Sequence, residues 1–82
     1  MRSLHLAVDR WVAERLQALG RPALPPQADL HDQGLLDSVS LVELLQVVEA
    51  ATGREVDLLE LDLDALTTVA AVKAELARVV GD

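Results

Sequence analysis

The sequence predicts an all-α fold, a small four-helix bundle with three main helices and one short helix. Apolar residues recur at spacings of three and four in the first and last parts of the chain, as in amphipathic helices. No segment alternates apolar and polar residues for long enough to indicate a strand, and no hairpin turn signal is present. A chain of 82 residues has room for one core, so residues 1–82 are expected to form a single domain.

The first predicted helix runs from about Ser3 to Leu19. Ser3 can cap its N-terminus through the side-chain hydroxyl, and Gly20 can take the left-handed conformation that ends a helix. Pro22 then prevents the helix from continuing. The apolar positions expected to face the core are Leu4, Val8, Trp11, Val12, Leu16 and Leu19.

A long ordered loop is expected from Arg21 to Asp37. Its three prolines fix the backbone and remove N–H donors, which excludes a helix there. Structureless loops longer than about 12–15 residues are uncommon in small domains and are often functional. The residues expected to hold this loop on the core are Leu24, Leu30, Leu35 and Leu36.

The second helix should begin near Asp37 or Ser38 and end near Thr52, with Gly53 as its stop. Nine of the thirteen residues from 39 to 51 are apolar. A helix that is apolar nearly all round is central, or it leaves apolar groups exposed for a partner.

The rest of the chain is predicted to hold a short helix and the last main helix. After an acidic connection over residues 54–64, one short turn is expected at Asp62–Leu66, with Asp62 as its cap. Thr67 or Thr68 should cap the last helix, which ends near Val80. Its expected buried positions are Val69, Val72, Leu76, Val79 and Val80.

Composition excludes several classes of protein. With 14 acidic and 7 basic residues the net charge is −7, which argues against nucleic acid and against an anionic membrane as partners. The longest stretch without a charge is eight residues, far short of a spanning helix, and no secretory signal is evident, so a cytoplasmic location is expected. The absence of cysteine removes disulfides, thiolate zinc sites and thiol catalysis.

Ser38 is the residue with the most chemical interest. It follows a loop and opens a helix, where unpaired backbone N–H groups and the helix dipole favour an attached anion. Residues 29–64 around it carry ten acids and one base, which indicates more than an ordinary solvated surface. Local chemistry alone also allows a plainer interpretation, in which Ser38 or Asp37 is only the N-cap.

Three segments together resemble the acyl and peptidyl carrier protein family, which binds phosphopantetheine. Residues 29–44, with Asp37-Ser38-Val39 at their centre, resemble the attachment region. Residues 50–56, Ala-Ala-Thr-Gly-Arg-Glu-Val, look like the end of the family's second helix. Residues 66–72, Leu-Thr-Thr-Val-Ala-Ala-Val, look like the entry to its last helix. The order and spacing match over essentially the whole chain.

The resemblance implies a carrier and not an enzyme. Ser38 would be joined to 4′-phosphopantetheine, delivered from coenzyme A by a phosphopantetheinyl transferase, and the cofactor's thiol would hold an acyl or aminoacyl group as a thioester. Asp37, Val39, Val42 and Glu43 occupy positions that partners of such carriers read or that support that surface. The implied partners are the transferase, an acyl- or aminoacyl-activating ligase and downstream acyl-processing enzymes, and the protein is expected to be a monomer.

The residues before Ser38 indicate which type of carrier within the family the chain resembles. Gly-Leu-Leu-Asp-Ser at 34–38 looks more like free-standing D-alanyl carriers and the discrete carriers of specialised-metabolite pathways than like fatty-acid carriers. The second helix also has few acids, with neutral residues at Ser40, Gln46 and Ala50. A stand-alone carrier in a specialised-metabolite pathway is therefore expected.

The residues around Ser38 and the apolar second helix also allow three other interpretations. A serine hydrolase built from Ser38, His31 and Asp32 or Asp37 lacks the nucleophile-elbow motif and an oxyanion-hole loop. A calcium loop starting at Asp29 lacks the bidentate glutamate at its twelfth position, so no metal site is expected. A small helical adaptor that uses the apolar second helix, with Ser38 only an N-cap, remains the alternative function.

Overall fold

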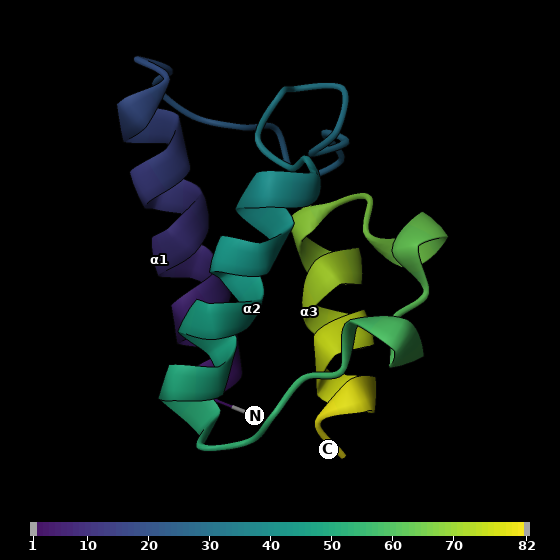
Figure 1. Ribbon diagram of the computed structural model, residues 1–82. Helices are drawn as coiled ribbons and strands as arrows, with labels where there is room; N and C mark the ends of the chain where they lie inside the picture. Colours follow the sequence, from purple (N-terminus) through teal and green to yellow (C-terminus); the bar gives the residue numbers. More distant parts are fainter. Residues whose placement is uncertain (1, 82) are drawn as a thin grey trace.

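The computed structural model describes residues 2–81 and confirms the all-α fold (Figure 1). Its helices are α1 (Arg2–Ala18), α2 (Ser38–Thr52) and α3 (Val69–Val79), and residues 2–81 contain no strand. Two 3-10 turns, η1 (Leu58–Glu60) and η2 (Leu63–Ala65), lie between α2 and α3. The predicted short helix is therefore a single 3-10 turn, and η1 was not predicted. No helix within the described range is long and apolar enough to cross a membrane.

Of the caps predicted for the two ends of α1, one is wrong and one is confirmed. The helix already includes Arg2, so Ser3 lies inside the first turn and the prediction that it is the N-cap was wrong. Gly20 ends the helix as predicted, with φ 68°, and its N–H donates to the Gln17 carbonyl at 3.1 Å. Leu19 is 44% exposed and not part of the core, because it lies beyond the last helical residue.

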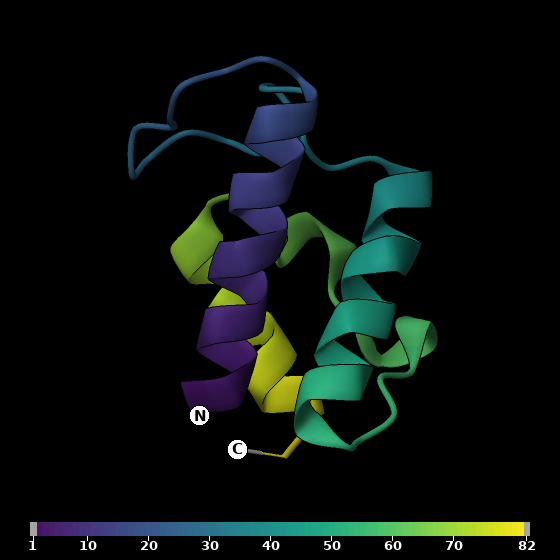
Figure 2. The same ribbon diagram turned by 90° about the vertical axis from the view of Figure 1, so that its left-hand side faces the viewer.

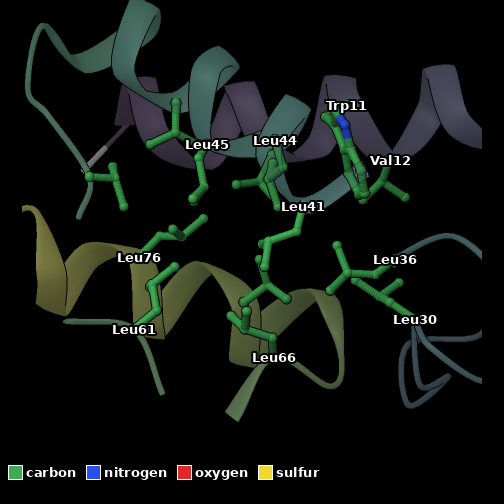
Figure 3. Close-up of a cluster of buried hydrophobic side chains, with 14 of the residues drawn as sticks. Trp11, Val12, Leu30, Leu36, Leu41, Leu44, Leu45, Leu61, Leu66 and Leu76 are labelled. Atoms are coloured by element: carbon green, nitrogen blue, oxygen red, sulfur yellow. The ribbon is translucent and has the colours of Figure 1, made fainter. Parts of the chain in front are cut away.

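The core lies among the three helices, and α1 packs against both α2 and α3 (Figures 1 and 2). Leucine and valine fill it, and Trp11 is its single aromatic side chain. Figure 3 shows Leu44 and Leu45 of α2 opposite Leu76 of α3. The buried residues that had been predicted from the first and last helices are Leu4, Val8, Trp11, Val12, Val72, Leu76 and Val80.

The long loop before α2 is held as the sequence predicts. The side chains of Leu30, Leu35 and Leu36 are buried, and Leu24 is partly buried against the same cluster. The Leu30 N–H donates to the Thr67 carbonyl at 2.8 Å, which ties the loop to the entry of α3. The segment that ends at Leu36 therefore approaches α2 along a fixed course.

The connection between α2 and α3 is built from short capped turns. The carboxylate of Asp57 accepts from the Leu59 N–H at 2.9 Å, and that of Asp62 accepts from the Asp64 N–H at 3.1 Å. A short side chain that accepts from the backbone two residues on favours a turn over a longer helix. Asp62 is the cap that the sequence predicts, and Thr68 caps α3 through a hydrogen bond from the Ala71 N–H at 3.2 Å.

A buried carboxylate holds this connection on α3. Glu75 is 7% exposed and accepts hydrogen bonds from the Asp62 N–H at 2.7 Å and from Arg78 Nη2 at 2.6 Å. Arg78 also donates to the Glu60 carbonyl at 2.9 Å. The hydrogen bonds from Arg78, and then the one from Asp62, lower the pKa of Glu75 from its ordinary value of 4.5 to about 2.

This shift predicts an acid-sensitive contribution to stability. A carboxylate whose pKa is lower in the folded state stabilises it above the unfolded pKa, and the effect is lost as pH falls from about 4.5 towards 2. Glu75→Gln should therefore be less stable than the wild type at pH 7, with the difference shrinking below pH 4.5. Urea unfolding at several pH values measures this, with Glu43→Gln on the exposed face of α2 as the control. A difference that stays constant with pH would contradict the role of the charge.

Candidate functional site

Ser38 is the first residue of α2, and it is exposed. The N-cap is Asp37, whose backbone is extended and whose carboxylate accepts from the Ser40 N–H at 2.8 Å. Ser40 Oγ in turn accepts from the Asp37 N–H at 2.8 Å, which completes a reciprocal capping box. Of the two predicted N-cap candidates, Asp37 is therefore confirmed, and Ser38 as the N-cap is wrong. The Ser38 hydroxyl makes no hydrogen bond with another residue of the part that the structure describes.

Asp37 remains negatively charged beside this hydroxyl. The hydrogen bond from the Ser40 N–H is the largest cause that lowers the pKa of Asp37 below its ordinary value of 3.8, and the positive charge of Arg15 acts in the same direction. The carboxylate is thus ionised at neutral pH and exposed at the start of α2. A negative charge therefore lies next to Ser38.

An apolar groove of about 280 Å³ begins at Ser38. Its lining includes the buried Leu41 and Leu66, which are 9% and 1% exposed, and the exposed Leu58 of η1 and Leu63 of η2. The groove therefore lies between the start of α2 and the connection that precedes α3. All of the residues that line it are His31, Asp37, Ser38, Leu41, Val42, Leu58, Leu63 and Leu66.

Exposed apolar side chains gather along the same two segments. Among residues 2–81, seven large hydrophobic residues are exposed. Five of them lie on α2 or in the two 3-10 turns, and the other two belong to α1 and the residue after it. Leu59 is 92% exposed, so it has no part in the core. We call these five residues the apolar rim: Val39, Val42, Leu58, Leu59 and Leu63.

The structure places the predicted recognition residues on one helix. Asp37, Val39, Val42 and Glu43 are all exposed at or near the start of α2, and of these Asp37 and Val42 line the groove. The sequence analysis predicted the turn at Asp62–Leu66 but not η1, and it did not predict that the leucines of the two 3-10 turns form an exposed surface. The two Asp-Leu pairs at 57–58 and 62–63 were the available signal, since each marks a capped turn that presents a leucine.

The enzyme interpretation gains no support from the geometry. His31 is exposed and lines the groove with Ser38, but no hydrogen bond within residues 2–81 joins the two side chains. One carboxylate oxygen of Asp29 accepts from the N–H groups of His31 and Asp32, at 2.8 and 3.2 Å, and so shapes the turn. Over the same range no group of three His, Cys, Asp or Glu side chains is placed to hold a metal ion.

Residues 2–81 thus form a small helical domain whose exposed Ser38 lies beside an apolar groove. The phosphopantetheine attachment site family matches residues 11–76, which are 66 of the 82 residues. The chain belongs to this family of carrier proteins, which covalently carry 4′-phosphopantetheine and are not catalysts. No curated protein and no solved structure gives a significant match to the chain.

Proposed function

We propose that Ser38 is the residue to which 4′-phosphopantetheine is attached. The observation that carries the proposal is the free, exposed hydroxyl at the first residue of α2, in a chain of a family that carries this cofactor. The other two serines are less suited. Ser40 is 3% exposed and its hydroxyl is committed to the capping box, and Ser3 lies in the first turn of α1.

The residues around Ser38 fit a long flexible arm. The groove that starts at the serine is lined mainly by leucine and valine, so it can take the apolar part of the arm or the start of a cargo chain. When bound, 4′-phosphopantetheine supplies a thiol to which an acyl or aminoacyl group is joined as a thioester. The chain itself presents the serine, keeps an ionised carboxylate beside it and offers an apolar surface to partners.

Attachment is a phosphoryl transfer to the serine. The Ser38 oxygen forms a bond to the phosphorus of the pantetheine phosphate of coenzyme A, and the pyrophosphate bond breaks. The adenosine bisphosphate half leaves with the bonding electron pair, and the serine proton passes to a base of the transferase. Because the transferase supplies the base, the carrier needs none of its own, which agrees with the absence of a hydrogen bond from His31 to Ser38 within residues 2–81.

The test is the intact mass of the protein before and after incubation with coenzyme A and a broad-specificity phosphopantetheinyl transferase. The mass should rise by one phosphopantetheine, and peptide fragmentation should place the addition on Ser38. A folded protein that gains no mass, or that gains it at another serine, would overturn the assignment.

We infer further that the carrier serves a specialised-metabolite pathway, loaded by an acyl- or aminoacyl-activating ligase. The Gly-Leu-Leu-Asp-Ser run before α2 supports this inference, as does the presence of only two acids on that helix, Glu43 and Glu49. Loading of the modified protein by a panel of such ligases tests it. Equal or better loading by enzymes of fatty-acid synthesis would contradict it.

Partner docking should depend on the apolar rim as well as on charge. The two ion pairs within residues 2–81 involve Asp9 and Glu75, so none of the ten acids from 29 to 64 is neutralised by such a pair. A partner surface with an apolar centre and a basic surround would complement this face.

Leu59→Ala tests the apolar part of this surface. Because Leu59 is 92% exposed, its removal should leave the free energy of unfolding within about 0.5 kcal/mol of wild type. The KM of the transferase for the carrier should rise at least threefold. Leu6→Ala, at an exposed leucine of α1, is the matched control and should leave the KM unchanged. Equal effects of the two substitutions would show that Leu59 does not take part in docking.

A further inference from the structure

We propose that Arg15 is a positioning residue for the modification of Ser38. Its guanidinium holds the backbone just before α2, so that the serine is presented to the transferase in one orientation. The inference rests on the proposed attachment at Ser38. It concerns a residue of α1, 23 positions away from Ser38 in the sequence and outside the groove.

Arg15 reaches from α1 to two neighbouring carbonyl groups of the loop. Its Nε donates to the Leu35 carbonyl at 3.2 Å, and its Nη2 makes a longer contact of 3.4 Å with the Gly34 carbonyl. A planar guanidinium can engage two acceptors at once, whereas a lysine ammonium presents a single point charge. The side chain is half-buried, so the contacts are only partly exposed to water.

Leu35 connects the contacts from Arg15 to the start of α2. Its carbonyl also accepts from Ser40 Oγ at 3.1 Å, and its N–H donates to the Leu30 carbonyl at 2.9 Å. Ser40 closes the capping box with Asp37, the residue directly before Ser38. A displacement of Leu35 is therefore passed through Ser40 and Asp37 to the serine.

Arg15 adds to the support that the buried side chains of Leu35 and Leu36 already give this turn. Gly34 adopts φ 76°, a conformation that glycine takes readily, and a glycine leaves the backbone free to rotate. The Ser38 hydroxyl makes no hydrogen bond within the described part of the chain, so only its backbone fixes its position. Phosphoryl transfer requires an aligned oxygen, and a misplacement of about 1 Å can cost about a hundredfold in rate. The contact from α1 supplies alignment that neither the glycine nor the serine provides.

The experiment compares initial rates of phosphopantetheine transfer to the unmodified protein for wild type, Arg15→Met and Arg15→Lys. Arg10→Met, at an exposed arginine of the same helix, is the control. Both Arg15 variants should lower kcat at least threefold with KM within twofold of wild type, and Arg10→Met should change neither. Amide hydrogen exchange at Leu35 and Leu36 should be faster in both Arg15 variants than in Arg10→Met.

Several results would overturn the inference. Wild-type rates in Arg15→Lys would show that the positive charge suffices and that the two carbonyl contacts do not matter. A rise in KM alone would mean that Arg15 touches the transferase instead of positioning the serine. Urea unfolding establishes that each variant is folded during the assay, and Arg15→Lys keeps the charge and the aliphatic stem if Arg15→Met is too unstable. A wild-type protein that is never modified would refute the proposed function itself, whereas a modified wild type with unaffected Arg15 variants refutes only this inference.

Discussion

Ser38→Ala should abolish phosphopantetheine attachment completely while leaving the protein as stable as the wild type. The hydroxyl is the proposed acceptor, and no other group of the residue takes its place. Because Asp37 and not Ser38 caps α2, the substitution removes no capping hydrogen bond. The free energy of unfolding should therefore stay within about 0.5 kcal/mol of wild type. Intact mass after incubation with coenzyme A and the transferase, together with urea unfolding, measures both effects.

Ser40→Ala, two residues along the same helix, should give the opposite result. Its loss leaves the Asp37 N–H without its acceptor and the Leu35 carbonyl with Arg15 as its remaining side-chain donor. The cost should be about 1–3 kcal/mol of stability, but at the end of a long incubation every folded molecule should still carry the addition. Two serines would then have separate roles, one chemical and one structural. Residual mass gain in Ser38→Ala, or none in Ser40→Ala, would contradict this division.

The sequence predicts the helices well because their signals are local. Apolar spacing identifies α1 and α3, and glycines with positive φ end α1 and α2 where the sequence places them, at Gly20 and Gly53. The predictions that failed concern where a helix begins or ends. Ser3 lies inside the first turn of α1 and does not cap it. Leu19 continues the apolar spacing of α1 but is exposed, because spacing does not show where a helix ends.

Some residues of the candidate site could also be predicted from the sequence, and others could not. Ser38 and Asp37 could be found from the sequence, because a recognisable motif surrounds them. The hydrogen bonds from Arg15 to the loop, and those that Glu75 and Arg78 make with the connection before α3, could not be predicted. Each of them joins a side chain to backbone atoms more than twelve positions away. Nothing in the residue type marks an arginine as bound to a distant carbonyl. Ser40 could have been recognised, because the Asp-x-x-Ser spacing allows a reciprocal cap.

Leu44→Ala should be the most destabilising of the substitutions considered. Leu44 is fully buried on α2 and points into the cluster that Leu76 of α3 enters from the other side (Figure 3). Removing a buried leucine side chain costs about 2–5 kcal/mol, through lost burial and the cavity left behind. At roughly 0.05–0.15 kcal/mol per residue, a chain of this length has a total stability of about 4–12 kcal/mol, so much of it would be lost.

Urea unfolding of Leu44→Ala and of Leu59→Ala separates the effect of burial on stability from the effect of the leucine side chain itself. The two substitutions remove the same atoms, one from a buried position and one from a 92% exposed position. The exposed substitution should change the free energy of unfolding by less than about 0.5 kcal/mol. A cost below about 1 kcal/mol at Leu44 would contradict the prediction, since it would mean that the neighbouring side chains close the cavity. A core of leucine and valine with one aromatic residue would then be deformable enough to admit part of a cargo chain from the adjacent groove. The expected larger cost would instead indicate a rigid core, with the cargo held at the surface.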